Sequence, residues 1–366
     1  MHAAVTAMRP AAIGKARLCL GLKSMSPAYF GMAMATGIVS IAAHLLGYAW
    51  LAMWLFRLNL TIFIVLWLLL VMRVWLYPRN VLDDFIDHLR GPGFFTTVAA
   101  CGILGSQCIL IVGSLRWAAA LWVAALLLWI ALTYAIFAVF TVKEHKPPLD
   151  EGINGGWLLA VVATQSLAVL ATLLAAHMTQ PFKLEMNFFA LSMWLWGGML
   201  YIWMMSLIFY RYTFFRFSPA DLSPPYWINM GAMAISTLAG SLLILNAPDA
   251  PFLLSLLPFI KGFTVFYWAT GTWWIPMLLV LAIWRHGIKR FPLRYDPLYW
   301  GAVFPLGMYA ACTKRMVDAM ALEFLGFLPR VFLAIAVAAW TIVFLGFLMS
   351  LFDQYRPRTA SADRAR

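Results

Sequence analysis

Charged residues are scarce in this chain. Asp, Glu, Lys and Arg make up 11% of its 366 residues, whereas 64% are hydrophobic, and the mean hydropathy is +0.85. The interior of a globule of this length cannot hold so many apolar side chains. The composition therefore excludes a soluble protein and predicts an all-α polytopic membrane protein.

Motifs of catalysis and metal binding are also missing. The cysteines show no CxxC spacing, the six histidines form no HExxH-like cluster, and no GxGxxG or P-loop string opens a helix. We therefore expect no enzyme activity, no cofactor and no metal site, and we interpret the cysteines as packing residues. The four cysteines are Cys19, Cys101, Cys108 and Cys312.

Carboxylates are absent from the middle of every apolar segment. All 14 Asp and Glu residues lie in loops, at the termini or at helix ends. A proton-driven transporter usually keeps a carboxylate at membrane depth and a cation pore usually needs a ring of them, so both classes are disfavoured. A neutral passage with basic mouths favours anions instead, because a cation is repelled at both ends.

What the chain does have is a repeat. A proline or a glycine pair opens an apolar segment five times, at intervals of 65, 63, 70 and 72 residues. One membrane span needs about 20 residues, so each interval accommodates a hairpin of two helices, and five hairpins predict a pseudo-fivefold ring. The openers are Pro27, Pro92, Gly155 with Gly156, Pro225 and Pro297. The ten expected spans are 29–46, 53–76, 93–113, 117–141, 156–176, 188–210, 226–246, 258–284, 298–313 and 331–352.

The positive charges predict the orientation. With both termini inside, 19 of the 26 Lys and Arg residues fall on the cytoplasmic side, as expected because short basic loops stay in the cytoplasm. We interpret the net charge of +12 as a topology signal that attracts membrane lipids, and not as a nucleic-acid-binding surface. The expected parts are a basic cytoplasmic arm (1–26), a transmembrane domain (27–352) in the inner membrane, and a short cytoplasmic tail (353–366).

The two helices of each hairpin differ in composition. Fourteen of the 18 tryptophans fall in the even-numbered spans, whereas Ser, Thr, Asn and Gln are denser in the odd-numbered ones. Tryptophan favours lipid contact and the membrane interface, and a polar side chain in hydrocarbon needs a partner or water. We therefore place the odd spans inside, where they line a pore. The alternative is that Ser and Thr only join packed helices.

Small residues recur nine or ten residues after each opener, at one depth of the odd spans. They leave either close helix contact or an opening, and five such stretches around one axis favour a narrow, mostly neutral passage. We add Asn229 to the pore-lining candidates, because its side-chain amide is expected to bind an anion weakly. The pore-lining candidates are Thr36, Gly37, Cys101, Gly102, Thr164, Gln165, Asn229, Ala234 and Gly307.

Three strings carry a family resemblance: SPAYFGMAMATGIVS (26–40), GWLLAVVATQSLAVL (156–170) and VFPLGMYAACT (303–313). In this order the chain resembles the tellurite-resistance/dicarboxylate transporter family, which includes the plant slow anion channels, yeast malate permease and fungal sulfite efflux pumps. The resemblance implies ten helices in five hairpins, a homotrimer with one pore per subunit, and passive movement of small anions.

The resemblance also implies a gate. In the channels of this family, a phenylalanine next to a proline on an inner helix plugs the pore, and the matching residues here are Phe304 and Pro305. Proline removes a backbone hydrogen bond, and a phenyl ring in a narrow tube blocks and dewets it. We expect an anion channel or passive transporter constricted at Phe304. The alternative is a carrier or exporter for C4-dicarboxylates such as malate and succinate, for sulfite or for tellurite.

Overall fold

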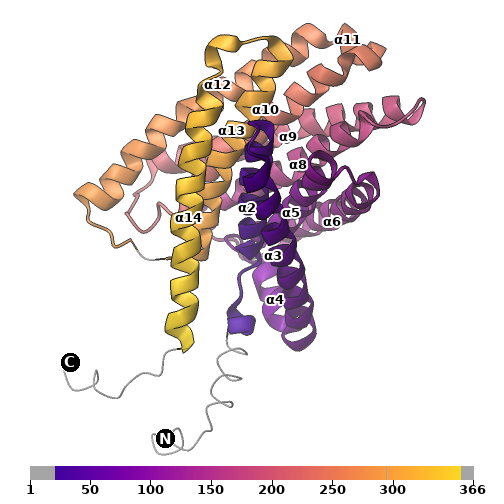
Figure 1. The fold of residues 1–366 in the computed structure, drawn as a ribbon. Coiled ribbons are helices and arrows are strands. Elements are labelled where there is room, and N and C mark those ends of the chain that lie inside the picture. Colours follow the sequence, from indigo (N-terminus) through magenta and orange to yellow (C-terminus); the bar gives the residue numbers. More distant parts are fainter. Residues whose placement is uncertain (1–20, 294, 356–366) are drawn as a thin grey trace, which may run out of the picture.

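The computed structural model describes residues 21–293 and 295–355, and all the regular structure of these residues is helical. Most of the predicted arm and tail, residues 1–20 with Cys19 and residues 356–366, lies outside the described part. The first described residues and the end of the last helix lie toward the same end of the bundle (Figure 1). The prediction of an all-α polytopic protein is confirmed.

Five hairpins follow one another along the chain, each with an inner helix that begins in a 3₁₀ turn and a longer outer helix. The inner helices with their opening turns are η1 (Pro27–Phe30) with α2 (Gly31–Leu45), η2 (Gly91–Phe94) with α5 (Phe95–Gln107), η4 (Gly155–Leu158) with α8 (Leu159–Ala175), η5 (Pro224–Trp227) with α10 (Ile228–Asn246), and η8 (Pro297–Tyr299) with α13 (Trp300–Met320). The outer helices are α3 (Ala49–Leu76), α6 (Leu115–Val142), α9 (Phe182–Phe214), α12 (Leu257–Ala282) and α14 (Leu328–Tyr355). Short connecting elements are α4 (Pro78–Ile86), π-helix η3 (Cys108–Val112), α7 (Leu149–Gly152), η6 (Ala247–Asp249), α11 (Pro251–Ser255), π-helix η7 (Ile283–Ile288) and η9 (Glu323–Leu325).

Nine helices of the described part, taken with their adjoining turns, are long and apolar enough to cross a membrane. The tenth predicted span, α13, is less apolar, and its second half carries Lys314, Arg315 and Asp318. The Lys314–Asp318 ion pair (2.5 Å) spans one helical turn there. The helix therefore continues past residue 313, where hydropathy alone places its end, to Ala321, whose φ of 56° ends it.

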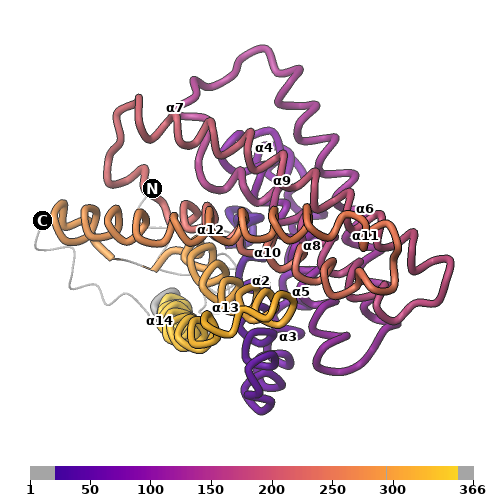
Figure 2. Tube along the Cα trace, turned by 90° about the horizontal axis from the view of Figure 1, so that it is seen from above, coloured from indigo at the N-terminus to yellow at the C-terminus, as the bar shows by residue number. Residues whose placement is uncertain are grey.

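The inner helices contact one another in a closed cycle. α2 packs against α5, α5 against α8, α8 against α10, α10 against α13, and α13 against α2. Figure 2 shows these five helices gathered in the middle, with α3 and α14 toward the edge. The most apolar stretches of the first four inner spans are 78–100% buried, compared with 17–50% for the outer spans. The odd-numbered spans thus form the interior of the protein.

Each outer helix donates at least one side-chain hydrogen bond to the inner helix of the next hairpin. The donors and acceptors are Asn59 Nδ2 to Gln107 Oε1 (2.7 Å), Trp129 Nε1 to Thr164 Oγ1 (2.8 Å), Trp194 Nε1 to the Ser236 carbonyl (2.8 Å), Trp268 Nε1 to Thr313 Oγ1 (3.0 Å) and Trp340 Nε1 to Thr36 Oγ1 (3.0 Å). We expected the outer tryptophans to face lipid. That holds for Trp75, which is 85% exposed, but Trp129, Trp194 and Trp340 are buried, because their indole N–H groups reach inward to the next hairpin.

A basic side chain near the end of the outer helix also closes four of the hairpins on themselves. It donates to a backbone carbonyl just before the inner helix of the same hairpin. The pairs are Arg73 with the Lys23 carbonyl (3.2 Å), Lys143 with the Ile86 carbonyl (3.1 Å), Arg211 with the Asp150 carbonyl (2.8 Å), and Arg285 with the Leu222 carbonyl. We call these four residues the basic clamps. In the sequence these residues served only as topology signals, but they also hold the start of four inner helices in place.

Candidate functional site

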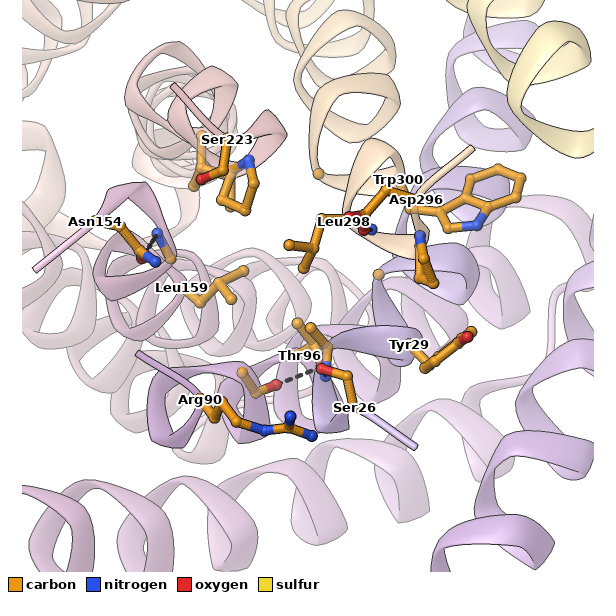
Figure 3. Close-up of a pocket in the computed structure, with 18 of the residues that line it drawn as sticks. Ser26, Tyr29, Arg90, Thr96, Asn154, Leu159, Ser223, Asp296, Leu298 and Trp300 are labelled. Carbon is orange, nitrogen blue, oxygen red and sulfur yellow. Dashed lines mark hydrogen bonds between the residues drawn. The ribbon is translucent and has the colours of Figure 1, made fainter. Parts of the chain in front are cut away.

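The five opening turns meet around one cavity. Its volume is about 450 Å³, and every inner helix contributes to its wall at or near its first turn. We call this cavity the vestibule. Figure 3 looks into it and shows Leu298 and Leu159 pointing toward its centre. The residues that line it include Ser26, Ala28, Tyr29, Gly31, Met34, Arg90, Gly93, Thr96, Asn154, Gly156, Leu159, Ser223, Pro225, Ile228, Asp296, Leu298, Gly301 and Phe304.

Local sequence explains why the helices begin here. Proline lies in the first two positions of four of the five turns, where the missing N–H costs nothing. Three turns have a side-chain cap, in which Ser26, Asn154 and Asp296 each accept a hydrogen bond from the backbone N–H two residues on (2.8–3.2 Å). The predicted openers are thus helix starts.

Neighbouring turns also lie very close together. A Cβ atom on Gly155 would collide with the carbonyl group of Pro225, so only glycine allows η4 to approach η5 in this way. On the other side of the ring, Thr96 Oγ1 donates to the Pro27 carbonyl (3.0 Å) and ties α5 to η1. These contacts hold the rim of the vestibule as one ring of turns.

The vestibule is attractive to anions through its backbone. The N-terminal end of a helix carries a partial positive charge from its unpaired N–H groups, and here five such ends face one space. Among the described residues, its lining has one basic side chain, Arg90, and one acidic side chain, Asp296. We expected a passage free of carboxylates with basic mouths. Asp296 places one carboxylate in this lining, because a helix N-cap favours Asp on local grounds.

Phe304 lines the vestibule and is only 1% exposed. The next residue, Pro305, packs on Gly231 of α10, where a Cβ atom would lie 2.7 Å from Pro305 Cγ. The rigid proline ring and the missing side chain at 231 bring α13 and α10 together one residue beyond Phe304. The backbone that carries the phenyl ring is therefore held on one side.

The nine pore-lining candidates lie elsewhere on the inner helices, and none of them contributes to the vestibule as the described residues define it. The polar atoms of three are engaged by outer helices. Thr36 and Thr164 accept hydrogen bonds from Trp340 and Trp129, and Gln165 Nε2 donates to the Trp194 carbonyl (2.9 Å).

The other candidates lie at contacts between helices or in the buried interior. The Asn229 side chain donates to Tyr212 Oη (3.3 Å) of α9. A Cβ atom on Gly102 would meet Ser166 of α8, and one on Gly307 would meet Ile38 of α2. A Cβ atom on Gly37 would meet Ile103, Asn59 and Gln107. Cys101 and Ala234 are buried.

Sequence reasoning missed most of the vestibule lining. Thr96, Leu159 and Ile228 each lie three residues beyond a residue of the opening turn that also lines the cavity, namely Gly93, Gly156 and Pro225. Residues three apart share one face of a helix. Counting one turn onward from each opener would have found them. Within the described residues, no group of three or more His, Cys, Asp or Glu side chains is placed to hold a metal ion.

Comparison with known proteins agrees with this architecture. Two uncharacterized transporters of Methanocaldococcus jannaschii are each 26% identical to the chain, over 318 and 316 residues, which is 84% of this chain and 88–89% of theirs. An uncharacterized membrane protein of Mycobacterium tuberculosis is 40% identical over 152 residues, which is 42% of this chain and 77% of that protein.

The match to a protein family is broader still. The sequence model described as voltage-dependent anion channel, which represents the family that the three strings resemble, matches residues 24–348. This range begins just before the first opening turn and ends within α14, so it takes in all five hairpins. The chain is therefore a multi-pass membrane protein that belongs to the voltage-dependent anion channel family.

Proposed function

We propose that this protein lets small anions pass along the axis of its inner helices, with Phe304 as the narrowest point. One observation carries the proposal: five helix N-termini face one cavity, and Phe304 is among the residues that line it. The positive helix ends lower the energy of an anion in the vestibule. The buried phenyl ring beyond excludes water and with it the hydrated ion.

The surroundings of the axis fit passive movement. A carrier that binds a dicarboxylate needs a cationic side chain to pair with the carboxylates of the ligand. The inner helices α2, α5, α8 and α10 contain no Lys or Arg. On α13, Lys314 and Arg315 lie near the end away from the vestibule. Along these inner helices the anion is held by partial charges instead. Membership of a family described as anion channels supports the same conclusion.

The test is electrical recording on the purified protein in planar lipid bilayers. Phe304→Ala is expected to raise the anion conductance several-fold, since it removes the ring from the path. The matched control is Phe266→Ala, the same deletion at a side chain on α12 that is 49% exposed, and it is expected to leave the conductance unchanged. A Phe304→Ala conductance at or below that of the parent protein would count against a constriction at this residue.

A carrier or exporter of C4-dicarboxylates, sulfite or tellurite is the second candidate, favoured by the similarity to proteins described as transporters. Flux that saturates with concentration and that a second anion inhibits competitively would favour the carrier. Large unitary currents would favour the channel.

The assembly and its setting complete the proposal. We place the protein in the inner membrane with both termini and the vestibule on the cytoplasmic side, because 19 of the 26 Lys and Arg residues fall on that side in the predicted topology. We also propose a homotrimer with one passage in each subunit, as the family resemblance implies. Membrane lipids would then cover the remaining apolar surface of the outer helices.

A further inference from the structure

Arg90 is the basic side chain among the described residues of the vestibule lining, and an ion pair fixes its orientation. It directly precedes η2. Its Nε lies 2.6 Å from Asp84 Oδ1, and its Nη2 donates to Asp84 Oδ2 (3.1 Å). A carboxylate that accepts from both nitrogens fixes the plane of the guanidinium group. The side chain is nevertheless 44% exposed, so the group is both oriented and accessible.

A second arginine holds the carboxylate. Arg73 Nη2 lies 2.6 Å from Asp84 Oδ2, and the Arg73 and Asp84 side chains are only 2% and 10% exposed. Burying an arginine is expensive unless its partners are well placed. Arg73 also donates to the Lys23 carbonyl, so it links Asp84 to the segment that precedes η1.

The two arginines share one carboxylate, so Asp84 does not neutralise Arg90 by itself. Two guanidinium groups therefore face one carboxylate in this ion-paired group. Asp87 Oδ1 is already occupied by the backbone N–H groups of residues 89 and 90 (2.9 and 2.8 Å). Lys143 donates to the Ile86 carbonyl on the same stretch. The group of Arg73, Arg90 and Asp84 therefore keeps a positive charge.

The pairing leaves donors free for a ligand. A guanidinium group has five N–H donors, and Asp84 takes one from Nε and one from Nη2. One hydrogen on Nη2 and both on Nη1 remain, and the described structure records no partner for Nη1. These two nitrogens form the end-on edge of the fork, which matches two oxygens of one anion.

We propose that Arg90 binds the anion that enters the vestibule. The passage therefore prefers anions with two adjacent oxygens, such as carboxylates and planar oxyanions, over halides. Arg73 and Asp84 are positioning residues that aim the fork. This inference rests on the proposed function, because it names the anion class that the same passage selects. Asp296, on the opposite side of the cavity in Figure 3, repels all anions alike and does not discriminate between them.

The experiment measures reversal potentials with formate or nitrate on one side of a planar bilayer and chloride on the other, in the Phe304→Ala background. Arg90→Gln is expected to lower the formate-to-chloride and nitrate-to-chloride permeability ratios about two- to fivefold, the range of one exposed ion pair. Arg90→Lys keeps the charge and loses the planar fork, so it is expected to lower both ratios while retaining most of the conductance. A fall for formate alone would restrict the preference to carboxylates.

Asp296→Asn is the matched control, since asparagine keeps the N-cap to Leu298 and removes only the charge. It is expected to raise the conductance for formate, nitrate and chloride together and to leave the ratios unchanged. Unchanged ratios in both Arg90 variants would overturn this inference while the passage itself stands. Absence of anion current in the parent protein and in Phe304→Ala would overturn the proposed function.

Discussion

His88 lies two positions before Arg90 in the chain. Its ring stacks on the ring of Phe140 with a centroid distance of 4.2 Å. Burial lowers the pKa of His88 below its ordinary value, and the nearby charge of Lys143 lowers it further. The histidine is therefore neutral in the folded protein at pH values where the unfolded chain already binds a proton.

This residue predicts a loss of stability in acid. The contribution of neutral His88 to the free energy of unfolding is fully present above the pKa of a histidine in the unfolded chain, about 6.5. It is lost as the pH falls through the lower pKa of His88 in the folded protein. The melting temperature in detergent is expected to decrease between pH 7.5 and pH 5. His88→Phe keeps the stack on Phe140 and is expected to flatten that decrease. His145→Gln, at an exposed site, is the control and should keep the wild-type slope; an equal slope in all three proteins would contradict the prediction.

At the scale of elements, two sets of hydrogen bonds organise the helices. One set runs from each outer helix to the next inner helix, and the basic clamps close four of the five hairpins on themselves. A single interhelical hydrogen bond in a membrane contributes only about 0.6 kcal/mol on average. The bonds from the outer helices to the next inner helices therefore stabilise the bundle together, not one by one. The clamps are individually stronger, because they carry a charge and satisfy buried carbonyls.

Arg211 is the clamp with the most partners. Its three guanidinium nitrogens reach the Asp150 carbonyl, Tyr226 Oη and Asp221 Oδ1. Arg211→Met is expected to lower the free energy of unfolding by roughly 2–3 kcal/mol, because a buried acceptor that loses its donor costs about 1–3 kcal/mol. The measurement is thermal or denaturant unfolding of the purified protein in detergent. Arg216→Met, at an exposed site at the end of the same segment, should change stability by less than about 0.5 kcal/mol.

At the scale of the whole molecule, the vestibule opens at the end of the bundle where the described chain begins and where α14 ends. Leu298 points into it (Figure 3). The native cysteines of the described part, Cys101, Cys108 and Cys312, are buried. One cysteine at position 298 therefore reports both the orientation of the protein and the potential in its vestibule.

Leu298→Cys, in a background with Cys19→Ser, is expected to react with methanethiosulfonate reagents from the cytoplasmic side of membrane vesicles. The ratio of the anionic to the cationic labelling rate should be higher at this site than with free cysteine, because five helix ends make the potential in the vestibule positive. Labelling only from the opposite side would show that the orientation is reversed. If the ratio of the anionic to the cationic labelling rate is lower in the vestibule than with free cysteine, the result would contradict the positive potential.

The sequence by itself determined the architecture, since architecture depends on properties that add up along the chain. Apolar composition specified a helical membrane protein, and the recurrence of Pro27, Pro92, Gly155, Pro225 and Pro297 located the inner helices to within a few residues. These signals are local, because a proline or a cap acts on its own helix turn.

Only the tertiary structure decided which way each side chain faces. Thr36 and Thr164 resemble pore residues by composition, yet both bond to outer helices. The partner of Thr36, Trp340, lies 304 positions away in the chain, and no local pattern encodes such a pairing. The rotation of a helix about its axis is set by packing against all its neighbours at once. For this reason the vestibule lining and the clamped fork of Arg90 emerge only when the five hairpins are assembled.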